Sequence, residues 1–392
     1  MTSVKKSKVR NHPPSHKAFI FIALTLLATP SVSKAQHKLI NSNLLLEGRV
    51  NYGFLINHHL EMKIFNSHFP AFEINVGKET FGQQRWESEY GYPIIGISYW
   101  YSQLGNSEFL GRSNALFPYI NYPIVRDVKH ELNFRVGLGL GYLTKCFDPV
   151  TNYKYLAIGS HVNAAINLMV EYRWRMSPRV QLASGLALMH FSNGSTKTPN
   201  YGINSPSINV ALAYRLSNEN AYQNRKLLPE LYKFEFDGKR SVNLNLAATM
   251  GYKDMGQEYG KTFMVYNFSG DLLAPLSFKS SGGLGFDFTR NQSDPYFAEL
   301  QDVMIKHDYE LYRMGISLAY QLRMSKLSYM FNTAMYVFGT MAPSFGYFKF
   351  GLQYLAYKNV FATLTFRSHL ARADFIGLGL GYRLPLYVYK PH

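Results

Sequence analysis

Hydrophobic and polar residues alternate along much of the chain. In residues 132–142 the even positions are large and apolar, and the odd positions are asparagine, arginine or glycine. The same period of two runs through residues 162–174, 312–322 and 376–384. Such alternation is typical of a β-strand that presents one face to apolar surroundings and the other face to polar ones.

The alternating stretches are longer than the strands of soluble β-proteins. Strands in soluble sandwiches average about six residues, whereas many here run ten or more and end in tyrosine or tryptophan. Aromatic residues at strand ends form the interfacial girdles of membrane barrels. In lipid every backbone group needs a hydrogen-bond partner, so the sheet must close on itself. The pattern therefore predicts an all-β fold, a transmembrane antiparallel β-barrel with its small and charged positions in the lumen.

The strand candidates fall into two groups. About sixteen can be marked, roughly eight on each side of the polar, irregular segment 217–240. AYRL at 213–216 resembles GYRL at 381–384, so an ancient duplication is one explanation. We expect one barrel of about 14–16 strands, because closing two barrels requires a further seam. Two eight-stranded barrels in series are the alternative. The expected division is a barrel half at 36–216, a periplasmic connection at 217–240 and a second half at 241–392.

Short and long connections alternate, and this alternation orients the barrel. Short turns are expected near residues 126–129, 176–179, 324–326 and 357–359, and longer loops near 145–160, 193–204 and 291–308. Bacterial barrels keep short turns in the periplasm and long loops outside. The strand that begins at Val180 therefore runs outward, and His190 lies near its outer end.

The N-terminal residues have the features of a secretory signal. A basic region precedes an apolar stretch, residues 18–28, that is too short to span a bilayer. Ser33-Lys34-Ala35 fits a cleavage site, so residues 1–35 are expected to be a signal peptide. A retained N-terminal anchor is the alternative.

Charge and cysteine content narrow the compartment and the partners. Six of the +16 formal charges lie in residues 1–35, which leaves +10 for the rest of the chain. In an exported protein this charge favours anionic lipid head groups over nucleic acid. The single cysteine, Cys146, excludes an internal disulfide. We expect the outer membrane of a Gram-negative bacterium, with no nucleic acid as partner.

The stretch MHFSNGSTKTPNYGINSPS, residues 189–207, carries the strongest candidate chemistry. His190 and Ser192 have the parity of the lipid-facing leucines before them, and Asn204 has this parity on the next strand. A serine with a nearby histidine is the arrangement of a nucleophile and its base. The plainer interpretation is a polar hairpin above the hydrocarbon. The H-x-S spacing alone does not decide between them.

The run His190-Phe191-Ser192-Asn193-Gly194, followed by Pro199-Asn200-Tyr201-Gly202-Ile203, resembles the lipid A 3-O-deacylase (PagL) family. The resemblance covers roughly residues 47–217. It implies an outer-membrane barrel that hydrolyses the ester-linked 3-position acyl chain of lipid A. It also implies Ser192 as nucleophile, His190 as base and Asn193 as part of the oxyanion site. That family's barrel has eight strands, so the resemblance leaves the second half of the chain unexplained.

One position departs from the family pattern. Where the family has a glutamate after the Gly-Ile pair, this chain has Asn204. Asparagine can orient the histidine but cannot supply the charge that stabilises an imidazolium. No Asp or Glu occurs between Glu171 and Glu219, so a substitute carboxylate would have to come from elsewhere. A slower enzyme, a recruited carboxylate and a barrel that binds lipid without cleaving it all stay open.

We expect an acyloxyacyl-hydrolase-like serine esterase that removes an acyl chain from lipopolysaccharide at the outer leaflet. Lys145, Lys154 and Lys197, in expected outer loops, could meet lipid A phosphates, with solvated loop charge as the alternative. No cofactor and no metal are expected.

The competing function is a non-catalytic barrel, either a small channel or a lipid-binding scaffold. The candidate lumen residues are Asn133, Arg135, Glu171, Arg173, Arg313 and Arg383. They could line a pore, or they could pair with one another and fill it. A homodimer is also open, because lipid-facing interfaces look like ordinary strands.

Overall fold

The structure is a computed structural model of the 392-residue chain. It describes residues 43–56, 59–216, 240–256, 260–369 and 372–389. The expected signal peptide and nearly all of the expected connection at 217–240 lie outside the described residues. In the described part of the chain, no helix has the length and apolar character needed to cross a membrane.

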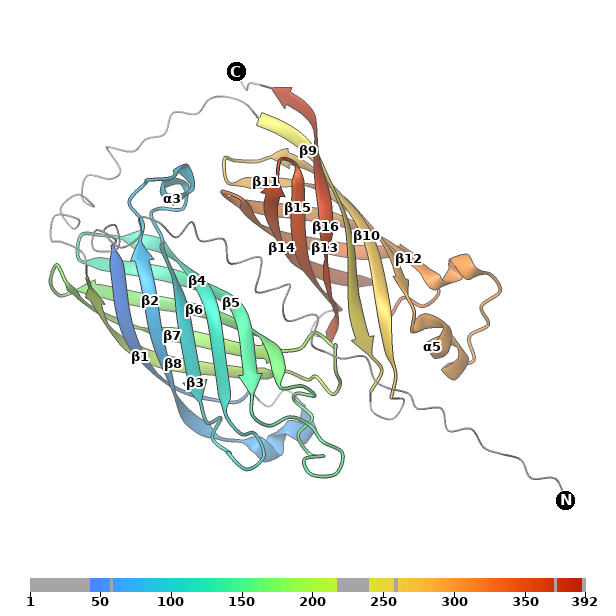
Figure 1. Ribbon diagram of the computed structural model, residues 1–392, viewed down its shortest axis with the longest axis horizontal. Coiled ribbons are helices and arrows are strands. Elements are labelled where there is room, and N and C mark those ends of the chain that lie inside the picture. The colour runs from blue at the N-terminus through green and yellow to red at the C-terminus, as the bar shows by residue number, and fades with distance from the viewer. Residues whose placement is uncertain (1–42, 57–58, 217–239, 257–259, 370–371, 390–392) are drawn as a thin grey trace. The chain divides into compact units, whose positions relative to one another are not determined.

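Strands make up most of the described residues (Figure 1). The strands are β1 (Leu44–Phe54), β2 (His68–Glu79), β3 (Ile94–Ser102), β4 (Ser113–Arg126), β5 (His130–Leu143), β6 (Val162–Arg175), β7 (Val180–Ser192), β8 (Ile203–Arg215), β9 (Arg240–Asp254), β10 (Thr262–Pro275), β11 (Ser280–Asn291), β12 (Tyr312–Met324), β13 (Leu327–Phe338), β14 (Gly346–Tyr357), β15 (Val360–His369) and β16 (Arg372–Tyr389). Short helices lie in the connections, namely η1 (Leu60–Phe65), α3 (Arg85–Glu89), α5 (Asp294–Leu300) and η2 (Asp308–Leu311).

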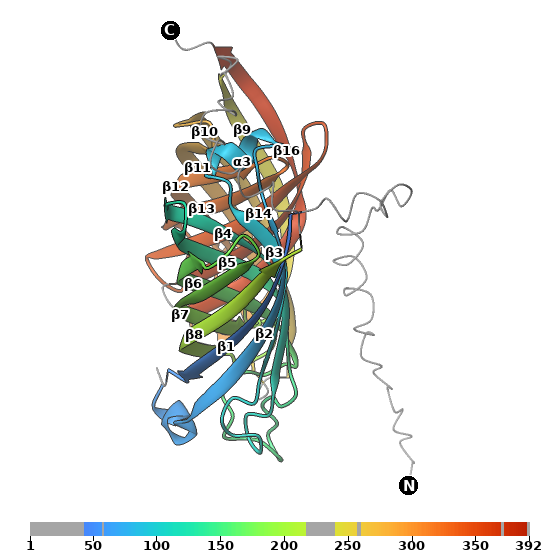
Figure 2. The same cartoon turned by 90° about the vertical axis from the view of Figure 1, so that its left-hand side faces the viewer.

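The strands form two closed antiparallel barrels, β1–β8 and β9–β16. In each barrel sequential strands pair, and the first strand closes against the last, β1 on β8 and β9 on β16. The strands of each barrel run obliquely around its wall (Figure 1, Figure 2). The prediction of an all-β antiparallel barrel fold is confirmed, with eight strands in each half.

The preference for a single large barrel is wrong, and the alternative of two eight-stranded barrels is confirmed. The reason lies in the seam strands. Val50 of β1 lies opposite Val210 of β8, and Tyr52 opposite Ile208, so the two edge strands present matching outer faces. Alternation determines which side chains face outward, but it does not determine which strand is the neighbour. The extra seam therefore leaves no open edge.

Burial follows the predicted parity. In β1 the side chains of Val50 and Tyr52 are more than half exposed on the outside, whereas Glu47, Arg49 and Asn51 are buried inside. Both barrels are thus apolar outside and polar inside. An exposed apolar surface of this extent is suited to hydrocarbon rather than water.

Ion pairs fill the lumen of the first barrel. Arg173 Nη2 lies 2.7 Å from Glu171 Oε1 and 2.7 Å from Glu47 Oε2, and Arg49 Nη2 lies 2.7 Å from Glu47 Oε1. All four side chains are buried. Each charge has a partner of opposite sign, as burial requires.

The second lumen is filled in a similar way. Lys349 Nζ lies 2.9 Å from Asp287 Oδ1, and Arg367 Nη2 lies 3.5 Å from the same oxygen. Arg313, one of the candidate channel residues, is buried and pairs with Asp294 of α5, and Arg383 donates from Nε to Asn245 Oδ1 at 3.1 Å.

The connections have the predicted lengths. Short turns follow β4, β6, β12 and β14, and long loops follow β5, β7 and β11. Over the first barrel the long loops pack on one another, because the Phe65 ring centroid lies 5.9 Å from Tyr155 and 6.2 Å from Phe109. This packed cap supports the loop between β7 and β8. Gly202 N donates to Ala157 O at 2.9 Å.

Candidate active site

The candidate site lies at the paired outer ends of β7 and β8. The pairing register places His190 directly opposite Asn204 and Phe191 opposite Ile203. Phe191 is fully buried toward the lumen, whereas His190 and Asn204 are partly exposed on the other face. The two polar side chains therefore lie on the outer wall, as their parity predicts.

Asn204 orients the imidazole of His190. The Asn204 Oδ1 atom lies 2.7 Å from His190 Nδ1. With the amide oxygen as acceptor, Nδ1 donates, and Nε2 then carries the lone pair of the ring. Gly202 lies against the same ring at φ +83, and a Cβ there would lie 3.1 Å from His190 Cε1. A glycine thus lets the loop lie close to the imidazole.

Ser192 is the last residue of β7 and is 8% exposed. Its Oγ accepts hydrogen bonds from Asn200 Nδ2 at 3.0 Å and from Gly194 N at 3.3 Å. Asn200 Oδ1 in turn accepts from Asn193 N at 3.1 Å. Asn200 therefore ties the serine hydroxyl to the backbone that follows it.

The side chain of Asn193, which the resemblance assigns to the oxyanion site, makes hydrogen bonds to two loops at the outer end of β7. Its side-chain amide donates to Ser160 Oγ at 2.9 Å and to Lys197 O at 2.7 Å, and the side chain is buried. One bond stays within the loop between β7 and β8, and the other goes to Ser160 in the loop before β6, so the Asn193 amide links the two loops. Gly194 N and the Asn200 amide are the donors that reach Ser192 Oγ.

The sequence predicted His190, Ser192 and Asn204 as site residues, with the backbone N–H groups at 193–195 as candidate donors, but it did not indicate Asn200 as a contact of the serine. His190 and Ser192 lie on the same side of β7, about 7 Å apart along the strand. Asn200 stands eight residues after Ser192, across an irregular loop. Its place in the PNYGI run was a signal, but strand parity does not extend across a loop.

Aliphatic side chains cover the wall below the site. Leu186 of β7 lies opposite Ile208 of β8, and both are more than 60% exposed, at 65% and 63%. Val210 continues this surface at 56% exposed. An ester at the level of Ser192 would thus have an apolar wall beside its hydrocarbon chain.

The outer loops around the site carry positive charge. Lys145, Lys154 and Lys197 are all exposed, as expected for residues that could meet phosphate. Asp148 Oδ1 accepts from Thr151 N at 2.7 Å and from Val150 N at 3.0 Å. These hydrogen bonds lower the pKa of Asp148, and the bond from the Thr151 backbone has the largest effect. Asp148 thus stabilises its own loop.

The described residues hold no group of three or more His, Cys, Asp or Glu side chains arranged to bind a metal ion. The one cysteine, Cys146, lies 3.6 Å from His161 Nε2, and burial raises the pKa of its thiol. Cys146 and His161 both lie in the loop between β5 and β6, whereas His190 and Asn204 lie on β7 and β8.

Two family matches cover most of the chain. Residues 71–213 match the family described as "Lipid A 3-O-deacylase (PagL)", and residues 240–386 match "Acyloxyacyl hydrolase, C-terminal domain". The first match falls within the first barrel and the second match within the second barrel. The half of the chain that the resemblance left unexplained therefore has a family match of its own. A search among curated proteins gives no match.

Several solved structures share some similarity with the chain. The outer membrane enzyme PagL is 16% identical, with 43% of this chain and 97% of that chain covered and a TM-score of 0.31. Neisserial surface protein A is 9% identical, with 44% and 97% covered and a TM-score of 0.32. A variant of Rh. blastica porin is 9% identical, with 87% and 99% covered and a TM-score of 0.18.

Proposed function

Because the chain belongs to the lipid A 3-O-deacylase (PagL) family, we propose that it is a serine esterase of the Gram-negative outer membrane. Its substrate would be lipid A, the lipid anchor of lipopolysaccharide, from which it removes one ester-linked acyl chain. The observation that carries the proposal is the His190–Asn204 hydrogen bond beside Ser192 on the outer, apolar wall of the first barrel. At this position, Ser192 and His190 would contact a lipid that lies beside the barrel in the membrane.

Substrate binding would combine hydrocarbon contact and charge. The acyl chain lies along Leu186, Ile208 and Val210, whose exposed side chains form the wall below the site. Phosphates of lipid A meet Lys145, Lys154 and Lys197 in the outer loops. These contacts place the ester carbonyl at the level of Ser192.

The first chemical step would be acyl transfer to the serine. His190 Nε2 takes the proton from Ser192 Oγ as Oγ bonds the ester carbonyl carbon. The carbonyl oxygen becomes an oxyanion, and the proposed donors to it are Gly194 N–H and the Asn200 amide, which lie beside Ser192 Oγ. The C–O ester bond then breaks, and His190 returns the proton to the sugar oxygen that leaves.

The second step would be hydrolysis of the acyl-enzyme. His190 takes a proton from water, and the hydroxide attacks the acyl carbon. The serine oxygen leaves with that proton, and the fatty acid is released. Asn204 holds the imidazole in the same tautomer throughout, but as a neutral amide it adds no charge stabilisation to the imidazolium.

The lumens argue against the channel alternative. In both barrels, buried side chains that pair with one another occupy the interior, as described for Glu171 and for Asp287. A lipid-binding scaffold without catalysis is the second candidate, and Asn204 in the place of a carboxylate favours it. Activity separates the two.

The test is mass spectrometry of lipid A from cells that express the wild type, Ser192→Ala or Ser184→Ala. Ser184 is an exposed serine on the same face of β7 and serves as the matched control. We expect one acyl chain to be lost with the wild type and with Ser184→Ala, and none with Ser192→Ala. Intact lipid A in all three, with folded barrels confirmed by their electrophoretic shift on heating, would favour the scaffold.

A further inference from the structure

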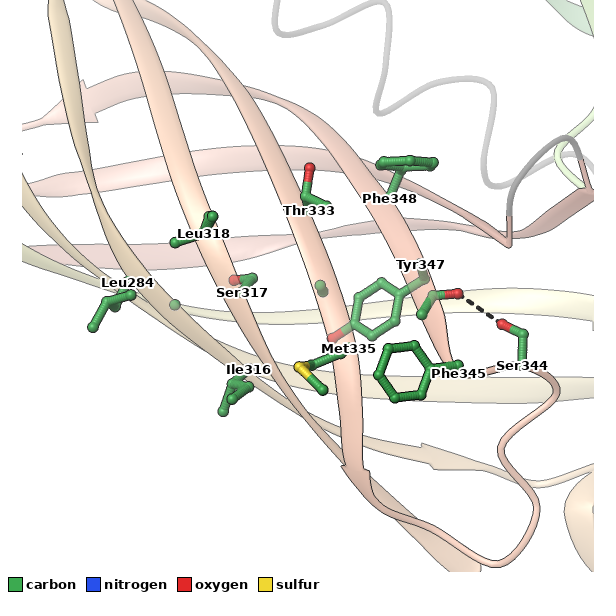
Figure 3. A pocket seen from close by; sticks show the side chains of 13 residues that line it. Leu284, Ile316, Ser317, Leu318, Thr333, Met335, Ser344, Phe345, Tyr347 and Phe348 are labelled. Carbon is green, nitrogen blue, oxygen red and sulfur yellow. Dashed lines mark hydrogen bonds between the residues drawn. The ribbon is translucent and has the colours of Figure 1, made fainter.

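An apolar groove lies on the outer wall of the second barrel, across β11–β14 (Figure 3). Its volume is about 770 Å³, within the roughly 300–1,000 Å³ typical of small-molecule sites. Large apolar side chains border it, among them Leu284, Ile316, Leu318, Met335 and Phe348. None of its lining residues is ionisable except Tyr347.

Small residues at two outward positions create the hollow. Thr333 lies between Leu318 and Phe348 in the pairing register, and Gly346 lies opposite Met335. A Cβ on Gly346 would lie 2.8 Å from Ala334 O. Phe345, which is 76% exposed, lies in the loop before β14. The groove therefore begins at the loop end of β13 and β14 and runs down the wall.

The hydroxyl groups of Ser344 and Tyr347, two of the polar lining residues, already have partners. Ser344 Oγ donates to Gly346 O at 2.7 Å, and Tyr347 Oη donates to Asp287 Oδ2 at 2.9 Å inside the barrel. A peptide in the groove would bring backbone N–H and C=O groups that need partners at this depth. A hydrocarbon chain needs none, so the lining fits an acyl chain.

A cation lies above the groove on the same wall. Arg290 shares the outward parity of Leu284 on β11, and its guanidinium lies 5.4 Å from the ring centroid of Tyr312, the residue opposite it on β12. Tyr312 is four residues, about 13 Å, from Ile316 in the groove. Among the described residues no carboxylate forms an ion pair with Arg290. Its Nη1 donates to the neutral carbonyls Asn291 O at 3.4 Å and Leu311 O at 3.3 Å, so within the described part of the chain a phosphate would be its first negatively charged partner.

We propose that the second barrel binds one lipid A molecule on its outer wall, with an acyl chain in the groove and a phosphate at Arg290. The site has no nucleophile with a base beside it, so it holds lipid A without cleaving it. The inference rests on the proposed outer-membrane location and substrate class. It assigns a lipid-binding role to the half of the chain that lies outside the proposed His190 and Ser192 site.

Native mass spectrometry of the purified full chain in mild detergent, with added lipid A, tests the proposal. All proteins carry Ser192→Ala, so that turnover does not remove lipid. Thr333→Trp fills the groove, whereas Leu380→Trp places the same bulk at an outward position of β16, 64% exposed and outside the groove. Arg290→Gln removes the cation, and dephosphorylated lipid A serves as its control ligand.

We expect Thr333→Trp to lose about one lipid A per chain, while Leu380→Trp keeps the full number. Arg290→Gln should bind lipid A about tenfold more weakly, with dephosphorylated lipid A unaffected. Equal lipid A occupancy in Thr333→Trp and Leu380→Trp would overturn the proposal. Thr333→Trp that loses a bound phospholipid but keeps lipid A would also overturn it. So would Thr333→Trp that loses a dimer and keeps its lipid A.

Lipid counting does not depend on catalysis, so the two proposals can fail separately. A chain that leaves lipid A intact in cells but shows this binding pattern would refute the esterase and keep the groove. A chain that deacylates lipid A with the groove filled and lipid occupancy unchanged would refute the groove alone.

Discussion

Asn204 stands where the family resemblance implies a glutamate, and in the proposed mechanism it would limit what His190 can do. The 2.7 Å hydrogen bond fixes the ring and its tautomer. It supplies no negative charge as the imidazolium forms, whereas the carboxylate of a Ser-His-Asp triad both holds the tautomer and stabilises the imidazolium. Asn204 therefore orients the His190 ring but carries no negative charge.

Replacing Asn204 with glutamate should raise activity. We expect Asn204→Glu to increase the rate of lipid A deacylation by about tenfold or more, because a carboxylate would stabilise the imidazolium. Asn204→Gln is the control of equal length without charge, and it should show no gain. The measurement is the initial rate of fatty acid release from lipid A in mixed micelles. A rate in Asn204→Glu no higher than in Asn204→Gln would mean that charge at this position is not limiting.

Asp294 gives the second barrel a pH-dependent element. It begins α5, is fully buried and pairs with Arg313. Burial raises its pKa to about 6, and the Arg313 charge opposes part of that rise. Because the folded pKa lies above the ordinary value of about 4, its contribution to folding is present below about pH 4 and is lost as the pH rises through about 6.

We expect the thermal midpoint of the wild-type barrel to contain a downward step between about pH 4 and pH 6, and Asp294→Asn to lack that step. Asp302→Asn, an exposed acid in the same loop, should keep it. The midpoint is read from the electrophoretic shift on heating. The same pH dependence in both variants would contradict the assignment to Asp294.

At this scale the sequence predicted what parity controls. It placed His190, Ser192 and Asn204 on the outer wall, since neighbouring strands in register bring residues of one face together. It did not predict the positions of Asn193 and Asn200, because their contacts depend on how the loop from Gly194 to Gly202 folds back over β7.

At the scale of the strand, glycines mark places where neighbouring backbone approaches closely. A Cβ on Gly139 of β5 would lie 2.2 Å from Leu116 O and 2.6 Å from Phe117 Cα. Gly48 of β1 has nothing within 4 Å of such a Cβ. Two glycines in one barrel thus differ sharply in what surrounds them.

We expect Gly139→Ala to destabilise the first barrel by about 1–3 kcal/mol, because the added carbon must displace backbone. Gly48→Ala should change stability by less than about 0.5 kcal/mol. Urea unfolding in lipid vesicles measures both. Equal midpoints for the two variants would show that β4 and β5 are farther apart than described.

The strands could be predicted from sequence much better than the connections. The alternating stretches 132–142, 162–174, 312–322 and 376–384 lie within β5, β6, β12 and β16, since a closed wall imposes a period of two. The short helices α3 and α5 carry no such period. They form because their loops pack locally, as Asp294 and Ala298 do when α5 buries them.

At the scale of the whole molecule, each half of the chain forms its own closed barrel. Every strand pair that completes the first barrel lies between Leu44 and Arg215, and the His190, Ser192 and Asn204 site lies within it. The sequence could not decide between one barrel and two. The alternation of apolar and polar residues in β1 is compatible with pairing to β8 or to another edge strand.

A chain that ends after Leu216 should therefore fold and keep its chemistry. We expect it to show the electrophoretic shift on heating and, if the esterase proposal holds, to deacylate lipid A in cells. A full-length chain analysed in parallel is the control. A truncated chain that reaches the membrane unfolded would show that closure of β1 on β8 needs the second half.

The two closing strand pairs, β1 with β8 and β9 with β16, also affect the order in which the barrels can fold. The first seam joins residues near 45 and 215, and the second joins residues near 241 and 388. A single sixteen-stranded wall would join residues about twice as far apart along the chain, and each doubling of a closed loop costs about 0.6 kcal/mol and slows folding. With separate seams, the first barrel can finish while the second is still being delivered. The chain then never forms an open sixteen-stranded sheet whose first and last strands stay unpaired until one final closure.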